Sequence, residues 1–160
     1  MKNFVVDPVV RSTSGFDLID DGALKFLIEK LFPLSSLVTP NLPEAERIAQ
    51  MRIENADDIK KAAKIMQSFG AKNVLIKGGH LPILDFGFWI LDLKKGEDRK
   101  PKTKNQKPKT EDRKAIDFLF TGNRLQTFEA DFIETDATHG TGCTLAAAIT
   151  ANLANGKTLS

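Results

Sequence analysis

The sequence predicts an α/β fold, in which helices flank a mainly parallel sheet. Short apolar runs suited to buried strands alternate with stretches in which apolar residues recur at helical spacing. Near the C-terminus, two further apolar runs are separated only by a turn, which predicts an antiparallel hairpin. A chain of 160 residues, 41% hydrophobic and 28% charged, fits a single domain with a sizeable core.

The first predicted strand is the apolar run Phe4-Val5-Val6, which ends at Asp7-Pro8. Proline fixes its own φ and favours an extended conformation in the residue before it. The carboxylate of Asp7 is therefore expected at the carboxyl end of the strand. In open α/β sheets ligands bind at that end, so Asp7 is a candidate site residue.

Three amphipathic helices are predicted in the first half of the chain. The first can be capped by Asp20 or Asp21, and the second has Pro43 near its first turn. The third ends at Gly70. Apolar positions at helical spacing mark the first helix (Leu24, Leu27, Ile28, Leu31) and the third (Ile59, Ala62, Ala63, Ile65, Met66, Phe69).

Two more short strands alternate with these helices. Leu37-Val38-Thr39 follows the first helix, and Val74-Leu75-Ile76 follows the third. This alternation predicts right-handed crossovers between parallel strands. Lys77-Gly78-Gly79 comes directly after the third strand, where a lysine beside glycines can reach a phosphate as a point charge. The alternative is that Lys77 is only a solvated surface charge.

The final part of the chain contains the predicted hairpin and the most informative motif. Strands at 116–120 and 125–129 are joined across Thr121-Gly122-Asn123. The run Thr138-His139-Gly140-Thr141-Gly142-Cys143-Thr144-Leu145 then leads into a helix starting near Gly142 and ending at Asn155-Gly156. Glycines allow close approach of a ligand, and first-turn N–H groups attract anions and stabilise a thiolate. The motif predicts an anion cradle beside Cys143, although a buried structural cysteine is the alternative.

Residues 94–114 form a basic tract that we predict to be a disordered insertion within the domain, with Phe86–Leu93 as an apolar run before it. It holds ten Lys or Arg against four Asp or Glu, so the rest of the chain carries a net charge of −4 although the whole is +2. The tract has no hydrophobic residue to bury. It could bind acidic partners, but nucleic acid is disfavoured because no aromatic residues are interleaved.

The remaining composition argues against several classes of protein. No apolar run reaches the roughly 18 residues that a membrane span needs. The N-terminus becomes charged too early for a signal peptide. A single cysteine allows no internal disulfide, which suits the cytoplasm.

Four segments in the same order resemble the hydroxymethylpyrimidine/phosphomethylpyrimidine kinases, the thiamin-pathway branch of the ribokinase-like superfamily. They are Val5-Val6-Asp7-Pro8-Val9, Thr39-Pro40-Asn41-Leu42-Pro43-Glu44-Ala45, Lys77-Gly78-Gly79-His80 and the motif at 138–145. The resemblance implies a ribokinase-like fold with its antiparallel hairpin at one sheet edge. It further implies ATP-dependent phosphorylation of hydroxymethylpyrimidine and its monophosphate, with ATP and Mg²⁺ as cofactors.

The resemblance also assigns roles to individual residues. Cys143 would be the catalytic base, where related sugar kinases carry an aspartate, and Gly140, Thr141 and Gly142 would form the anion hole. Asn41 and Lys77 would contact ATP. Asp7 and Glu44 would hold Mg²⁺ directly or through water. Val9 would touch the pyrimidine ring.

The match covers a partial kinase domain, residues 1–160, which begins well inside the family's usual sequence. We therefore expect a chain that is inactive alone and needs a separate N-terminal half, and Phe4–Val6 becomes an unpaired apolar edge that favours association, including a homodimer. Smaller departures lie at Arg11-Ser12-Thr13 and Asp136-Ala137. The alternatives are a pyridoxal-type vitamin kinase fragment, an inactive remnant, or a non-enzymatic module that binds acidic partners through 94–114.

Overall fold

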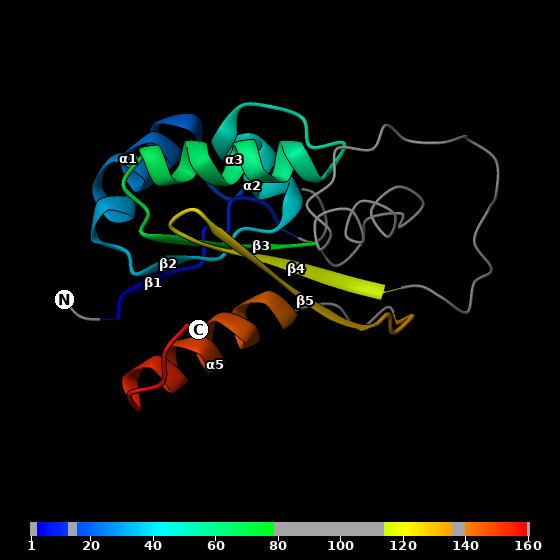
Figure 1. Ribbon diagram of the computed structural model, residues 1–160. Coiled ribbons are helices and arrows are strands. Elements are labelled where there is room, and N and C mark those ends of the chain that lie inside the picture. The colour runs from blue at the N-terminus through cyan, green and yellow to red at the C-terminus, as the bar shows by residue number, and fades with distance from the viewer. Residues whose placement is uncertain (1–2, 13–15, 79–113, 136–139, 160) are drawn as a thin grey trace, which may run out of the picture.

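The computed structural model describes residues 3–12, 16–78, 114–135 and 140–159. Their strands form one five-stranded sheet in the order β1-β2-β3-β4-β5 (Figure 1). The strands are β1 (Val5–Val6), β2 (Leu37–Val38), β3 (Asn73–Lys77), β4 (Lys114–Thr121) and β5 (Arg124–Asp131). The helices are α1 (Asp21–Leu31), α2 (Leu42–Ala49), α3 (Ala56–Ser68) and α5 (Thr141–Ala154), with a short 3₁₀ turn at Phe32–Leu34.

The sheet combines a parallel part with an antiparallel hairpin, as the sequence predicted. β1 pairs with β2 and β2 with β3 in parallel, whereas β4 runs antiparallel to both β3 and β5. The hairpin turn uses Gly122 at φ +57°, a left-handed conformation in which glycine has no steric cost. Because β4 and β5 end the strand order, the hairpin lies at one edge, and β1 lies at the other edge of the described sheet.

Helices cover both faces of the sheet. Helices α1, α2 and α3 lie over one face and α5 lies across the other (Figure 1). Successive side chains of a strand point to opposite faces, so each strand serves both layers. Val38 and Ile76 belong to the large core beneath α2 and α3, whereas Leu37 and Leu75 belong to a smaller cluster that includes Ile149 of α5.

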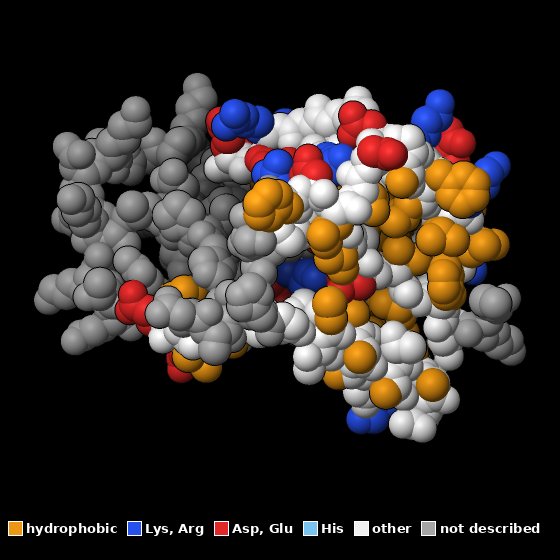
Figure 2. All heavy atoms as spheres, turned by 180° about the vertical axis from the view of Figure 1, so that it is seen from behind, with side chains coloured by type: hydrophobic (Ala, Val, Ile, Leu, Met, Phe, Trp, Pro, Cys, Tyr) orange, Lys and Arg blue, Asp and Glu red, His pale blue; other side chains and the backbone are white. Residues whose placement is uncertain are grey.

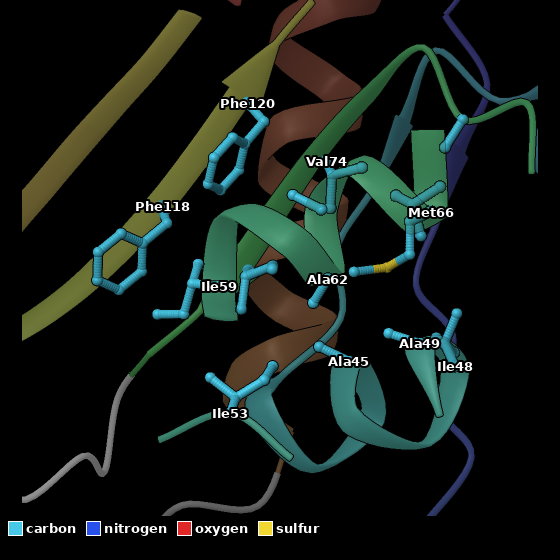
Figure 3. Packing of buried hydrophobic residues seen from close by; sticks show 14 of the residues in the cluster. Ala45, Ile48, Ala49, Ile53, Ile59, Ala62, Met66, Val74, Phe118 and Phe120 are labelled. Atoms are coloured by element: carbon cyan, nitrogen blue, oxygen red, sulfur yellow. The ribbon is translucent and has the colours of Figure 1, made fainter. Parts of the chain in front are cut away.

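The larger core takes buried residues from α1, α2 and α3 and from strands β1 to β4. Figure 3 shows Met66 of α3 pointing between α2 and the sheet, with Val74 and Ala62 close by. The apolar positions predicted from helical spacing at Ile59, Ala62, Ala63 and Met66 are all fully buried, whereas Ile65 is half-buried and Phe69 is exposed. The sequence pattern therefore identified the face of α3 that packs on the sheet.

Three of the helices have side-chain N-caps. Asp20 accepts a hydrogen bond from the N–H of Ala23, which resolves the choice between Asp20 and Asp21. Asn41 caps α2, which has Pro43 in its first turn as predicted, and Asn55 caps α3. Each of these helices also has an acidic residue in its first turn, which offsets the positive end of the helix dipole.

Some sequence predictions lie outside the described residues. These are Gly79-His80 after Lys77, the apolar run 86–93, the basic tract up to Arg113, Asp136-Ala137, and the start of the glycine motif, Thr138-His139. The last residue assigned to the basic tract, Lys114, instead begins β4, because its strand pairs in register with β5 up to Asp131. Within the described part of the chain, no helix combines the length and apolar character needed to cross a membrane.

Replacing Met66 by alanine should lower the free energy of unfolding by about 2–5 kcal/mol, because the buried side chain would leave a cavity between α3 and the sheet. Urea denaturation followed by circular dichroism measures this change. Lys64→Ala is the matched control in the same helix. Its side chain is exposed, so its substitution should change stability by no more than about 0.5 kcal/mol. Equal effects of the two variants would contradict the assigned packing face.

Candidate active site

A row of polar residues crosses the sheet on the α5 side, at the carboxyl ends of the parallel strands. We call Asp7, Thr39, Lys77 and Asp117 the polar row. Asp7, Thr39 and Lys77 each lie two positions beyond an apolar residue that faces α5, so strand alternation turns them to the same face. Asp117 joins them because β4 runs antiparallel and pairs it directly with Lys77.

Asp7 is the centre of the contacts within this row. Its Oδ1 accepts a hydrogen bond from Thr39 Oγ1 at 2.9 Å and another from Lys77 Nζ at 3.0 Å. The Asp7 and Lys77 side chains are each only 15% exposed, so solvent screens their ion pair less than it would screen a surface pair. The structure thus brings together two residues that are 70 positions apart in the chain.

Glu44 lies beside the polar row but is held by the start of α2. Its Oε2 accepts the N–H of Asn41 at 2.8 Å while the side chain of Asn41 accepts the N–H of Glu44, which completes a capping box. The residue is only 3% exposed. Burial raises the pKa of Glu44, and the negative charge of Asp7 adds to this. Hydrogen bonds from the backbone of Asn41 and Val10 and the charge of Lys77 act in the opposite direction.

Asn41 lies next to Lys77 through the backbone. The two residues form a parallel β-bridge, and the N–H of Lys77 donates to the carbonyl of Pro40 at 2.9 Å. The side-chain oxygen of Asn41 is used by the capping box. The predicted pair of ATP contacts, Asn41 and Lys77, is therefore adjacent in space.

The N-terminus of α5 differs from those of the other three helices. Gly140 is its N-cap at φ +77°, no side chain caps it, and its first turn holds no acidic residue. Lys77 lies against this turn, because a Cβ added at Gly142 would be 2.9 Å from Lys77 Nζ. A lysine cation therefore stands at the positive end of a helix dipole, and an anion held between them would stabilise both.

Cys143 and Val9 are accessible from solvent. Cys143 follows Gly142 in the first turn of α5 and is exposed, which removes the alternative of a buried structural cysteine. Val9 is 41% exposed just beyond β1, and its N–H donates to the carbonyl of Asp7. The structure thus places Asp7, Lys77 and Gly142 together, with Glu44 and Asn41 beside them and Cys143 in the same helical turn as Gly142.

The carboxylates fit a hydrated magnesium ion better than a directly ligated one. Among the described residues, no group of three or more His, Cys, Asp or Glu is arranged to hold a metal. Both hydrogen bonds described for Asp7 go to Oδ1, and the Glu44 carboxylate accepts backbone N–H groups. Mg²⁺ keeps several waters and takes only one or two carboxylates, so this donor set suits contact through water.

Sequence reasoning placed Thr39 in a strand but did not assign it to the site, and it also missed Asp117. Asp117 accepts a hydrogen bond from the N–H of Gly78 at 3.0 Å. Burial raises its pKa, while the N–H of Gly78 and the charge of Lys77 act to lower it. The available signal was a charged residue inside the apolar run Ile116–Phe120, which marks a position facing away from the larger core.

The family of the chain follows from a comparison with known proteins. The family model described as phosphomethylpyrimidine kinase matches residues 1–160. The chain belongs to the phosphomethylpyrimidine kinase family. It is 38% identical over 157 residues to a hydroxymethylpyrimidine/phosphomethylpyrimidine kinase of Staphylococcus aureus, a match that covers 98% of this chain and 47% of the relative.

A second curated relative, a bifunctional thiamine biosynthesis protein of Geobacter sulfurreducens, is 39% identical over 155 residues, or 97% of this chain and 26% of that protein. This member of the phosphomethylpyrimidine kinase family thus spans about half the length of the kinase relative and about a quarter of the bifunctional one.

Solved structures confirm the ribokinase-like fold class predicted from the sequence. An ADP complex of Bacillus subtilis pyridoxal kinase is similar with a TM-score of 0.70 and 32% identity, covering 99% of this chain and 48% of that one. A phosphomethylpyrimidine kinase from Clostridium difficile gives a TM-score of 0.66 at 34% identity, covering 99% and 51%.

Glu44→Gln should change how stability depends on pH in metal-free buffer. Because folding raises the pKa of Glu44 above its ordinary value of 4.5, the folded state favours the protonated form. The wild type should therefore lose stability relative to Glu44→Gln as pH rises from about 4.5 towards neutrality. Urea unfolding of both proteins at several pH values measures the difference. A difference that stays constant or changes sign in the other direction would contradict the burial of this carboxyl.

Proposed function

We propose that the chain is the phosphoryl-transferring part of a kinase that phosphorylates hydroxymethylpyrimidine and its monophosphate with ATP in thiamin biosynthesis. The observation that carries the proposal is the approach of Lys77 to the first turn of α5, which has no side-chain cap. Phosphoryl transfer requires mainly positioning and charge neutralisation, and a lysine beside the positive end of a helix dipole supplies both.

The proposed anion hole is formed by the backbone N–H groups of Gly140, Thr141, Gly142 and Cys143. The N–H of Thr144 donates to the carbonyl of Gly140, so these four groups lie at the N-terminus of α5, where the amides of a helix point outwards from its end. They would bind the transferred phosphoryl group, while Lys77 and Asn41 contact the phosphates of ATP. Relatives solved with ADP or a nucleotide analogue support a nucleotide ligand.

Magnesium, when bound, would offset the negative charge of the nucleotide phosphates. Asp7 and Glu44 would hold it through water, as their contacts favour. Lys77, which is paired with Asp7 at 3.0 Å, would face the phosphates from the same edge of the sheet.

Cys143 would act as the general base. Its sulfur would take the proton of the substrate hydroxyl while that oxygen forms a bond to the γ-phosphorus and ADP leaves. The cysteine lies in the first turn of α5, next to Gly142, and is exposed to solvent. Exposed Val9, beyond the end of β1, would contact the pyrimidine ring.

We infer that this activity requires the remainder of a family-length protein, either as a separate N-terminal half or in the same chain. Two observations support this inference. The chain spans about half the length of the kinase relative it matches, and β1 lies at the edge of the described sheet. Apolar side chains also gather on the side of the molecule that carries α1 (Figure 2). Exposed residues there are Phe16, Leu18, Phe26 and Leu34. A homodimer through the same surface is the alternative.

A second candidate function is a pyridoxal-type vitamin kinase. It is favoured by the pyridoxal kinases among the solved structures, at TM-scores up to 0.70. The same site would then transfer phosphate to a different ring alcohol. Binding of acidic partners through residues 94–114 remains a prediction from composition alone, and so does a cytoplasmic location.

Mixing the chain with the N-terminal half of a curated kinase relative, and then assaying ATP consumption, tests the proposal. Phosphorylation of hydroxymethylpyrimidine is the expected result, and a preference for pyridoxal would select the second candidate. Each half alone is the control. No turnover with either alcohol, together with no ATP binding, would identify an inactive remnant.

Cys143→Ala should reduce kcat of the reconstituted kinase by about 10² to 10⁴, the usual contribution of a general base. ATP affinity, measured by calorimetry, should change little because the anion hole uses the backbone of this residue. Thr150→Ala is a control in the same helix, at a distance from the first turn. A Cys143→Ala enzyme with unchanged kcat would exclude the sulfur as the base.

A further inference from the structure

Asp117 is a charged residue at a position where β4 is otherwise apolar. Its neighbours Ile116 and Phe118 are buried in the larger core, and Leu119 packs in the smaller cluster below α5. A carboxylate that is partly buried loses hydration, and this loss raises its pKa. Burial of such a carboxylate costs free energy unless its contacts compensate. Its neighbours across the sheet, Gly78 and Lys77, therefore indicate its role.

The first neighbour is the backbone of Gly78, immediately after the end of β3. The N–H of Gly78 donates to Asp117 Oδ1 at 3.0 Å. This amide is not available to the β3–β4 ladder, which ends at the Lys77–Asp117 pair. The side chain of Asp117 therefore extends the pairing of the two strands by one hydrogen bond beyond their last backbone pair.

Gly78 is also a point of close approach between the two backbones. A Cβ at this position would lie 2.1 Å from the carbonyl oxygen of Ile116 and 3.2 Å from the ring of Phe118. The carboxyl end of β3 is thus clamped to β4 by close packing on one side and by Asp117 on the other. Lys77, whose ammonium group reaches the first turn of α5, is the residue just before this clamp.

We propose that Asp117 is a positioning residue that fixes the end of β3. The side chain of Lys77 therefore leaves the sheet at a fixed position beneath α5. The inference deepens the proposed function and rests on it for the role of Lys77 in binding phosphate. Asp117 acts through the hydrogen bond to Gly78. Its negative charge close to Lys77 opposes an anionic ligand, so position and charge have opposite effects on nucleotide affinity.

Two substitutions separate these effects. Asp117→Asn keeps an oxygen that can accept from the N–H of Gly78 but removes the charge, whereas Asp117→Ala removes both. ATP affinity should be about tenfold lower in Asp117→Ala than in Asp117→Asn, because both variants lack the charge and only the asparagine keeps the hydrogen bond. Asp117→Asn should bind ATP at least as tightly as the wild type. Asp131→Ala, which removes an exposed carboxylate from β5, controls for net charge and should match the wild type.

Amide hydrogen exchange of the ligand-free chain, followed by NMR, gives a readout that does not depend on ATP. The Gly78 amide should exchange at least about tenfold faster in Asp117→Ala, with Leu75 unchanged as an internal reference, and should stay protected in Asp117→Asn. Unchanged Gly78 protection in Asp117→Ala would overturn the inference. So would equal loss of ATP affinity in both variants while Gly78 stays protected in Asp117→Asn.

If the wild type mixed with the N-terminal half of a kinase relative binds no ATP, the proposed function fails, and the exchange of Gly78 still decides whether Asp117 holds the end of β3. If ATP binds and Gly78 responds as expected while affinity does not, the proposed function stands and the positioning role is excluded. The two failures are therefore distinguishable.

Discussion

The ammonium group of Lys77 is the point on which the site depends. It is paired with Asp7 at 3.0 Å, and it also approaches the first turn of α5, where a Cβ added at Gly142 would lie 2.9 Å from Lys77 Nζ. The first contact is favourable. The second places a cation at the positive end of a helix dipole, which is unfavourable until an anion lies between them. The ligand-free arrangement thus contains an electrostatic cost that a phosphate group would remove.

Strand alternation explains how such a site forms from distant residues. Three parallel strands present apolar residues to the smaller cluster at one position and polar residues two positions later, at the edge where the strands end. The C-terminal half of α5 packs on the apolar positions through Ile149, and its first turn lies over Lys77. Helix α5 therefore covers the apolar part of this face and places its first turn over the polar row.

Much of this arrangement could be predicted from the sequence, because it depends on local patterns. Asp7 precedes a proline at a strand end, and Lys77 precedes glycines at another. The carboxyl ends of parallel strands meet at one edge of the sheet, so the sequence alone predicts that Asp7 and Lys77 belong to one site. The caps at Asp20 and Asn41 and the buried face of α3 are also local features.

What the sequence could not predict depends on register and burial. Asp117 belongs to the site only because β4 pairs antiparallel with β3 and aligns it with Lys77. Glu44 was assigned to magnesium by resemblance, but its use of backbone N–H groups and its near-complete burial emerge only from the packing of α2. For these two carboxyls, strand register and helix packing, more than residue type, decide what the charged group contacts.

The proposed function requires that a phosphate lies between Lys77 and the start of α5. A crystal structure of the chain with a non-hydrolysable ATP analogue and Mg²⁺ shows where the phosphates bind. We expect phosphate oxygens within hydrogen-bonding distance of Lys77 Nζ and of backbone N–H groups in the range 140–143. Nucleotide phosphates bound elsewhere, with Lys77 still paired only to Asp7, would contradict it.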